Sequence, residues 1–199
     1  MEKFVLELPG LVPQELCSEI ISRFDSDERK RVGVIGIAND GYVDTSRKRS
    51  TELHMLDVTG WEDISKIIFK YVNIAVTKYR DFLVKNFDNM HTMLYRDVIY
   101  GNFMDTGYEV QKIEHGDMYA WHHDGSFGRD NRLLNILIYL NTLEPHEGGT
   151  TELLNDIKIR PEAGKMLLFP ASWTFPHRGN VVLGKHKYIC CSLLNFDTQ

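Results

Sequence analysis

After Gly107 the sequence becomes a succession of short apolar runs, separated by turn residues and by no helical pattern. Short, closely spaced apolar runs without intervening helices are typical of an antiparallel barrel or sandwich. The runs cover residues 108–113, 118–123, 133–141, 150–154, 157–160, 165–169, 174–178 and 187–196. We therefore predict a mostly β core over residues 108–196.

Helical patterns come before this core. Leu16, Ile20 and Phe24 recur at helical spacing behind Pro13, which predicts a helix over residues 13–25. A longer apolar stripe predicts one helix over residues 61–86. The members of that stripe are Ile64, Ile67, Ile68, Tyr71, Ala75, Tyr79, Phe82 and Leu83. With two short strands expected at 31–37 and 51–56, the first half should buttress a double-stranded β-helix.

The composition favours one domain spanning residues 1–199, of which 43% are hydrophobic. Residues 1–107 would support the core, and residues 87–107 would form either a mobile lid or ordinary connecting structure. The net charge of −5 makes a nucleic-acid partner unexpected. The basic clusters 29–31 and 47–49 are interpreted as solvated loops.

No apolar run approaches the length of a membrane span, and the first residues do not resemble a secretory signal. Cys17 and the adjacent Cys190 and Cys191 cannot form a disulfide framework. These features predict a cytoplasmic protein without a membrane partner. The sequence gives no basis for predicting the oligomeric state.

A possible metal site lies at His122 and Asp124, which a strand would place on one face. Two histidines and one carboxylate form the facial triad that holds iron(II) and leaves positions open for oxygen chemistry. His177, from a distant run, is the candidate third ligand. The competing pair is His115 and Asp117, but the glycine between these two residues indicates a turn.

The last run places Lys187 on the same parity as Ile189, Cys191 and Leu193. A lysine drawn into a barrel needs an anion, because an unpaired charge in a low dielectric is costly. A dicarboxylate cosubstrate would supply this anion. The alternative is a lysine at the strand end whose amine reaches solvent.

The combined motifs resemble the prolyl 4-hydroxylase branch of the iron(II)- and 2-oxoglutarate-dependent dioxygenases. They are Tyr119-x-x-His122-x-Asp124, Tyr139-Leu140-Asn141, Gly148-Gly149-x-Thr151, Gly164-Lys165-x-Leu167-x-Phe169-Pro170, His177 and Gly184-x-x-Lys187. The resemblance covers residues 108–196 and implies a jelly-roll, cupin-like core. It also implies iron(II), 2-oxoglutarate and dioxygen as the reacting partners, with ascorbate as a possible reductant.

By this resemblance, His122, Asp124 and His177 would ligate the iron. Lys187 would pair with the distal carboxylate of 2-oxoglutarate, with Tyr139, Thr151 and Tyr119 assisting. His123, on the opposite parity, should be structural. The expected activity is hydroxylation of an unactivated C–H bond, with a peptidyl proline as first choice of substrate and a peptide or protein as partner.

Two positions differ from the family pattern, because Ile113 stands where a tyrosine is frequent and Leu193 where a tryptophan is frequent. The oxoglutarate pocket should therefore be reshaped. Arg129, Arg132, Trp173 and residues 95–107 are candidates for the substrate entrance, although Trp121 and Trp173 could equally be rim packing.

Several alternatives stay open at this stage. They are a hydroxylase of a free amino acid or another small molecule, a nucleic-acid demethylase of the same superfamily, a cupin-like enzyme that needs no cosubstrate, and a catalytically silent metal-binding module of the same fold. The cosubstrate-free enzyme would not need Lys187, and the demethylase branch uses paired arginines near its end that this chain lacks.

Overall fold

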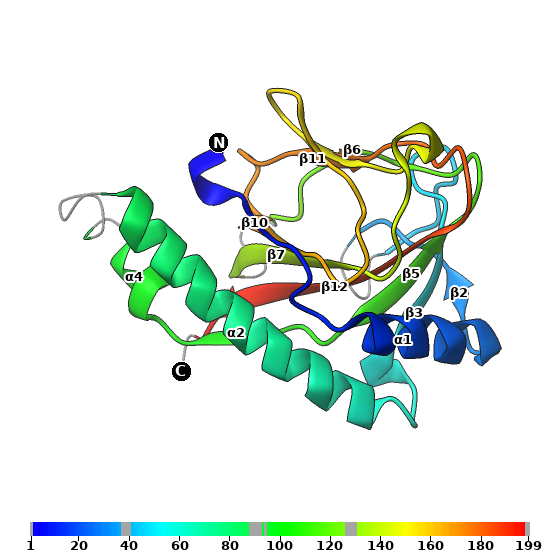
Figure 1. Cartoon of the computed structure of the whole chain (residues 1–199), viewed down its shortest axis with the longest axis horizontal. Coiled ribbons are helices and arrows are strands. Elements are labelled where there is room, and N and C mark those ends of the chain that lie inside the picture. The colour runs from blue at the N-terminus through cyan, green and yellow to red at the C-terminus, as the bar shows by residue number, and fades with distance from the viewer. Residues whose placement is uncertain (1, 37–40, 88–92, 94, 126–130, 198–199) are drawn as a thin grey trace.

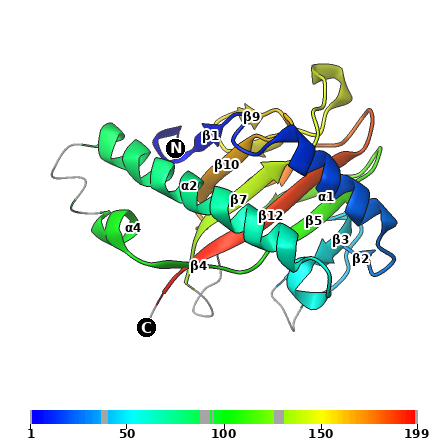
Figure 2. The ribbon, with the colours of Figure 1, turned by 60° about the horizontal axis from the view of Figure 1, so that its bottom comes forward.

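The computed structural model describes residues 2–36, 41–87, 93, 95–125 and 131–197. Two antiparallel sheets form the core of the protein, and two helices cross the outer face of the larger one (Figures 1 and 2). The larger sheet has the strand order β1-β10-β7-β12-β5-β3-β2, with β4 paired to β12, and the smaller has the order β6-β11-β8-β9.

The strands are β1 (Leu6–Leu8), β2 (Arg31–Val32), β3 (Thr51–His54), β4 (Phe103–Asp105), β5 (Glu109–Ile113), β6 (Tyr119–His122), β7 (Arg132–Tyr139), β8 (Thr151–Leu153), β9 (Ile157–Ile159), β10 (Met166–Pro170), β11 (His177–Gly179) and β12 (Lys187–Phe196). The α-helices are α1 (Gln14–Ser26), α2 (Glu62–Asn86) and α4 (Arg96–Tyr100). Short 3-10 helices are η1 (Glu2–Phe4), η3 (Met55–Asp57) and η4 (Pro145–Glu147).

The central pair of strands, β7 and β12, separates two hydrophobic clusters. Ile138 and Cys190 face α1 and α2 and belong to the larger cluster under these helices. Tyr139 and Ile189, one residue along, face the smaller sheet and belong to the second cluster. Because successive side chains in a strand point to opposite faces, one alternating sequence supplies both layers.

The two predicted long helices are confirmed to within one residue at each end. In α1, Ile20 and Phe24 are fully buried, and in α2 the buried stripe runs from Ile64 to Leu83. The stripe includes Val72 rather than Ile67, which is 36% exposed. Burying each large apolar side chain stabilises the fold by roughly 1.5–3 kcal/mol, so this stripe fixes α2 on the sheet.

The first half of the chain differs from the prediction in its short strands. The strand expected at 31–37 is reduced to β2, and Ile35 forms an isolated bridge with Tyr42. In the stretch proposed as a lid, β4 pairs with β12 and α4 contacts α2, so the described part of 95–107 is built into the fold. Residues 88–92 and 94 lie outside the described part.

The mostly β architecture with supporting helices confirms the predicted jelly-roll double-stranded β-helix. Within the described residues, no helix is long and apolar enough to cross a membrane. A cavity of about 630 Å³ opens between the sheets and is lined by residues from both. The candidate ligands lie in this cavity.

Candidate metal centre

The two candidate histidine ligands are direct cross-strand neighbours. In the pairing of β6 with β11, His122 stands opposite His177, and the ring centroids are 4.1 Å apart. Residues directly opposite in an antiparallel pair carry their side chains on the same face, so both imidazoles enter the cavity. The small sheet therefore holds two donors at a distance fixed by strand pairing.

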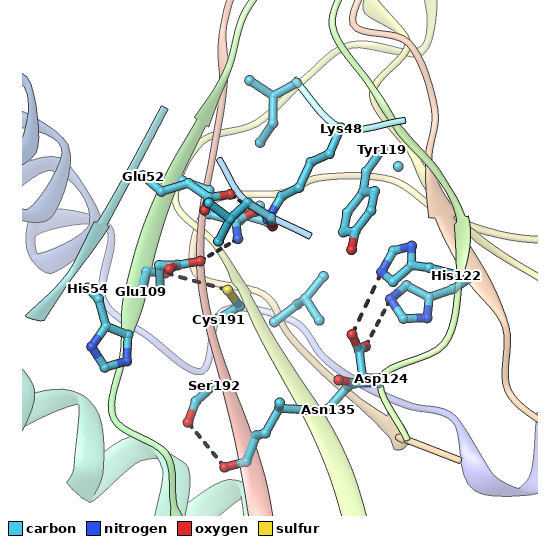
Figure 3. A pocket seen from close by; sticks show the side chains of 18 of the residues that line it. Lys48, Glu52, His54, Glu109, Tyr119, His122, Asp124, Asn135, Cys191 and Ser192 are labelled. Atoms are coloured by element: carbon cyan, nitrogen blue, oxygen red, sulfur yellow. Dashed lines mark hydrogen bonds and ion pairs between the residues drawn. The ribbon is translucent and has the colours of Figure 1, made fainter. Parts of the chain in front are cut away.

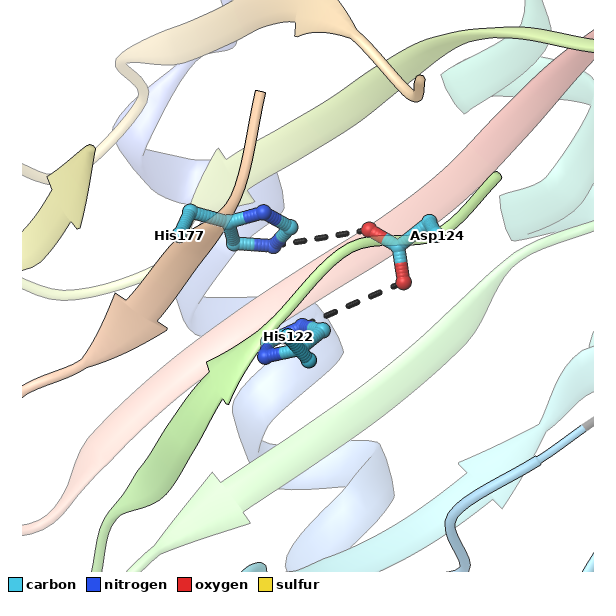
Figure 4. Close-up of side chains that lie close together, drawn as sticks. All are labelled: His122, Asp124 and His177. Atoms are coloured by element: carbon cyan, nitrogen blue, oxygen red, sulfur yellow. Dashed lines mark ion pairs between the residues drawn. The ribbon is translucent and has the colours of Figure 1, made fainter. Parts of the chain in front are cut away.

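Asp124 completes the group from just beyond the end of β6. The sequence placed it on the strand with His122, whereas β6 ends at His122 and Asp124 follows in the connecting segment. Its Oδ1 lies 3.9 Å from Nε2 of His122, and its Oδ2 lies 3.4 Å from Nε2 of His177 (Figure 4). The carboxylate thus faces both rings.

The donor atoms of His122, Asp124 and His177 all lie within 4.8 Å of one another, a spacing that fits one metal ion. Nδ1 of His122 lies 2.8 Å from the carbonyl oxygen of Ala120, and Nδ1 of His177 lies 3.4 Å from that of Phe175. Donation from Nδ1 to a backbone carbonyl leaves Nε2 as the free ligand atom. Two imidazoles and one carboxylate are a set that iron(II) accepts.

Burial keeps these imidazoles uncharged. It lowers the pKa of His122 to about 3, with a further decrease from the neighbouring His177. The pKa of His177 is lowered by burial as well, against the opposing effect of Asp124. Neutral imidazole is the form that binds metals, so the rings are ready as ligands.

Tyr119 supports His122 from the side. Its ring stacks on the imidazole with centroids 3.6 Å apart and an interplanar angle of 14°. On the other side of Tyr119, Nζ of Lys48 lies 5.0 Å from the ring centroid. Tyr119 therefore contacts a candidate metal ligand directly.

Lys187 lies at the inner end of the cavity and is 4% exposed. Its Nζ lies 5.6 Å from the ring centroid of Tyr139, whose hydroxyl donates a buried hydrogen bond of 2.8 Å to Oγ1 of Thr151. Burial lowers the pKa of Lys187 to about 8. Among the described residues no carboxylate forms an ion pair with this amine, which fits an acidic ligand between Lys187 and the histidines.

The Gly148-Gly149 motif has a steric role next to this lysine. Gly149 has a φ of +67°, and a Cβ there would come within 2.6 Å of the Leu143 side chain. The same Cβ would contact Cδ of Lys187 at 3.5 Å. The positive φ and the contact with Leu143 therefore require glycine, whereas the Lys187 stem lies at ordinary van der Waals distance.

The two departures from the family pattern both line the cavity. Ile113 on β5 stands opposite Lys187, and Leu193 on β12 stands opposite Asn135 on β7. Each substitutes an aliphatic side chain for an aromatic one. The cavity is therefore wider and less polar beside Lys187 than a tyrosine at residue 113 would make it.

His115 and Asp117, the competing His-x-Asp pair, belong to a turn that has a structural role. Gly116 has a φ of +82°, and the amide of Asp117 donates to the carbonyl of Glu114, which closes a turn. Asp117 accepts from Nε of Arg49 at 2.7 Å. These contacts tie the turn to the loop before β3, and His115 is exposed.

The residues expected at the entrance occupy mixed positions. Trp173 is 63% exposed, and Trp121 is 39% exposed with the Arg178 guanidinium 5.0 Å from its ring. Arg132 lines the cavity and donates to the carbonyl of Asp124 at 3.0 Å. Arg129 lies outside the described residues, and His123 is exposed, as its parity predicted.

One wall of the cavity was missed by the sequence analysis. Lys48 was interpreted as part of a solvated loop, and this interpretation is wrong, because its side chain is buried and forms a 2.5 Å ion pair with Glu52. Glu109 lines the same wall (Figure 3), and so does Gln111. The signal was available in the alternation of polar Glu109 and Gln111 around the apolar Val110.

Comparison with known proteins agrees with this geometry. A family model described as the 2OG-Fe(II) oxygenase superfamily matches residues 108–194, which contain all three candidate ligands and Lys187. The match covers the predicted β core, which is less than half of the chain. The name of the superfamily specifies iron(II) and 2-oxoglutarate, and the described donor set and the buried amine fit both. The predicted resemblance is thereby confirmed.

A curated relative and two solved structures are similar to this chain. A PKHD-type hydroxylase of Synechococcus sp. (strain CC9902) is 39% identical over 67 residues, which are 32% of this chain and 30% of that protein. The match therefore spans less than a third of the relative's length.

The structural similarity is more extensive. The viral collagen prolyl hydroxylase of Paramecium bursaria Chlorella virus-1 superposes with a TM-score of 0.67 at 18% identity, covering 96% of this chain and 95% of that one. A Trichoplax adhaerens prolyl hydroxylase, solved with a peptide fragment of the hypoxia inducible factor oxygen degradation domain, gives 0.67 at 18%, covering 97% and 84%. At such identities the likeness shows the fold, which is that of prolyl hydroxylases.

Proposed function

We propose that this oxygenase hydroxylates an unactivated C–H bond in a reaction that depends on iron(II) and 2-oxoglutarate. The observation that supports it most strongly is the convergence of His122, Asp124 and His177 in one cavity with a buried, unpaired Lys187. A metal site alone would not need this lysine. Conversely, a site that only bound an anion through Lys187 would not need three metal-ligand atoms in the same cavity.

In this proposal each residue has a defined task. Nε2 of His122, Nε2 of His177 and the Asp124 carboxylate would hold the iron(II). Tyr119 keeps the His122 ring in place by stacking. When bound, iron(II) and 2-oxoglutarate would supply the oxidising equivalent from dioxygen, with succinate and carbon dioxide as the coproducts.

The cosubstrate would be positioned by the residues around Lys187. The Lys187 ammonium would pair with the distal carboxylate, and the Thr151 hydroxyl would assist. The Tyr139–Thr151 hydrogen bond fixes the Thr151 hydroxyl. Ile113, opposite Lys187, contributes an apolar contact and no hydrogen bond. The buried second cluster around Tyr139 excludes water from this end of the cavity.

We further propose a peptide or protein substrate, with a peptidyl proline as the first candidate. The support is the names of the similar proteins, of which one is a collagen prolyl hydroxylase and one was solved with a peptide fragment. A reducing cytoplasm is the proposed location, since all three cysteines are free. We also propose one functional domain over residues 1–199, because α1, α2 and the β-core share one hydrophobic cluster.

The first test is anaerobic titration of the protein with iron(II) and 2-oxoglutarate, followed by the visible charge-transfer absorption of the chelate. His122→Ala and His177→Ala should abolish the absorption. His115→Ala is the matched control, because it removes a histidine from the competing His-x-Asp pair in an exposed turn, and it should leave the absorption unchanged.

Turnover then separates the alternatives. Candidate peptides, free amino acids and methylated oligonucleotides are incubated aerobically with ascorbate as reductant, and mass spectrometry follows the gain of one oxygen atom or the loss of a methyl group. A chelate that forms without iron-dependent succinate production would favour the silent module. Full activity of Lys187→Ala without 2-oxoglutarate would favour a cosubstrate-free enzyme.

A further inference from the structure

The cavity wall opposite the metal ligands is polar and belongs to the larger sheet. Glu52 on β3 stands opposite Gln111 on β5, and His54 stands opposite Glu109. These four residues share the inward face and line the cavity. In Figure 3 Glu52 and Glu109 lie across the cavity from the labelled His122 and Asp124.

Because of the strand register, Glu109 on this wall lies away from Lys187, beside which the cosubstrate would bind. On β12, Lys187 pairs with Ile113, whereas Cys191, four residues along, pairs with Glu109. At about 3.3 Å per residue, the two rows are roughly 13 Å apart. Glu52 stands opposite Gln111, which pairs with Ile189, so its row lies midway between those of Lys187 and Glu109. The inward face of the sheet therefore has a cationic end at Lys187 on β12 and an acidic end formed by Glu52 on β3 and Glu109 on β5.

The acidic end has more buried negative charge than positive. Oε1 of Glu52 accepts from Lys48 at 2.5 Å and from Ser50 at 2.7 Å. Glu109 accepts from Gln111 at 2.7 Å, and its pKa is raised by burial and by the nearby charge of Glu52. Two carboxylates thus share one buried ammonium, Lys48.

Arg31 reaches the same wall from the rim. Its guanidinium lies 3.9 Å from Glu109 and 3.1 Å from Asp57, and half of its side chain is exposed. Because this cation is partly solvated and shared with Asp57, it neutralises Glu109 only in part.

Two buried polar atoms that line the cavity have no hydrogen-bond partner among the residues that the structure describes. Oε2 of Glu52 is an unused acceptor, and Nδ2 of Asn135 is an unused donor. Both residues are at least 97% buried and line the cavity. Asn135 stands opposite Leu193 on β12, and β12 and β5 lie between its strand and that of Glu52, so the two atoms lie on opposite sides of the sheet face. Leaving such an atom unpaired costs about 1–3 kcal/mol, which an extended ligand that spans the sheet would offset by contacting each of them.

We propose that the acidic end is the substrate subsite and that it selects a substrate with a cationic group beside the carbon to be hydroxylated. An ammonium or guanidinium would donate to Oε2 of Glu52 and be neutralised by Glu109. A carbonyl oxygen of the same substrate would accept from Asn135. The same charges repel 2-oxoglutarate, which directs its distal carboxylate to Lys187. This inference rests on the proposed function and specifies its substrate class.

The test measures binding of matched probes to the protein loaded with iron(II) and 2-oxoglutarate without oxygen. The probes are capped tetrapeptides that carry lysine, arginine, norleucine or glutamate before a proline, together with free lysine and free norleucine, and calorimetry gives the affinities. We expect the lysine and arginine peptides to bind about tenfold tighter than the norleucine peptide, and the glutamate peptide not to bind.

Glu52→Gln and Glu109→Gln should each remove most of this preference, and Asn135→Leu should weaken all capped peptides alike. Glu114→Gln, which changes an exposed carboxylate just after β5, is the matched control and should preserve the preference. The chelate absorption and the thermal midpoint of each variant show whether the metal site and the fold are intact.

The outcomes separate the two proposals. Loss of the chelate absorption in the unaltered protein overturns the proposed function. A normal chelate without binding of any cationic probe, or with a lysine preference that persists in both glutamine variants, overturns the acidic subsite. Free lysine could bind more tightly than free norleucine while neither cationic peptide binds more tightly than the norleucine peptide. That result would support the subsite, assign it to a small cationic substrate and show that the peptide proposal is wrong.

Discussion

His122 and His177 are direct cross-strand partners in the small sheet, although they lie far apart in the chain. Strand pairing, rather than a loop, therefore sets the separation of the two imidazoles. Asp124 lies beyond the end of β6 and lacks this constraint. The centre thus combines two donors placed by strand pairing with one from the segment that follows β6.

The stack of Tyr119 on His122 should contribute to metal affinity. Aromatic contacts of this kind are worth about 0.5–1.5 kcal/mol, so Tyr119→Leu should weaken iron(II) binding by roughly two- to tenfold. Tyr119→Phe keeps the ring and should bind as the unaltered protein does. Anaerobic titration measures both variants, and equal affinities of the leucine and phenylalanine variants would show that the stack has no such role.

Replacing Lys187 should have opposite effects on cosubstrate binding and on stability. In Lys187→Met the distal carboxylate of 2-oxoglutarate loses its buried partner, which typically costs 2–5 kcal/mol, or about 30-fold or more in affinity. The protein without ligand should melt at a higher temperature, because a desolvated charge is removed. Lys158→Met on β9, whose side chain is exposed, is the control and should change neither quantity.

The lowered pKa of Lys187 predicts a pH dependence with a definite sign. Between pH 8 and 10.5 the unfolded chain keeps this proton while the folded protein releases it, so stability rises with pH. The contribution is about 3 kcal/mol over the window. Affinity for 2-oxoglutarate falls by up to tenfold per unit above pH 8, since binding needs the ammonium. Denaturation and calorimetry across pH 7–10 check both trends, and Lys187→Met should flatten them.

Much of the fold could be predicted from periodicity. The stripe in α2 and the alternation in β12 repeat over many residues, and their bounds were nearly correct. The short strand β2 was overestimated, because the expected run 31–37 contains two glycines and only its first two residues pair with β3. Local pattern identifies apolar residues, but it cannot tell which of them find a pairing partner.

Site residues could be predicted only where a residue type suited to metal binding also occurs in a recognisable sequence motif. His122 and His177 were chosen as metal-binding residue types, and the sheet register then brings them together. Lys48 was missed because its neighbours Arg47 and Arg49 are exposed, so the three basic residues resemble a solvated cluster. Its burial depends on Glu52, a contact made through folding of the loop onto β3 and Tyr119.

Lys48 and Glu52 should stabilise the folded protein only when both side chains are present. The two side chains are 7% and 1% exposed, so removing one partner leaves a charge in a low-dielectric site. Lys48→Met should therefore cost about 3–5 kcal/mol of unfolding free energy. Because Oε1 of Glu52 also accepts from Ser50, part of the carboxylate stays satisfied, and the lower end of this range is expected.

The double variant Lys48→Met with Glu52→Gln removes both charges and should recover most of the loss, since a neutral pair needs no compensation. Urea denaturation of the four proteins measures the coupling. Arg47→Met alters the exposed neighbour of Lys48 and should stay within about 0.5 kcal/mol of the unaltered protein. Additive effects of the two single changes would mean that Lys48 does not neutralise Glu52, and the charge excess inferred for the acidic end would then be larger by one unit.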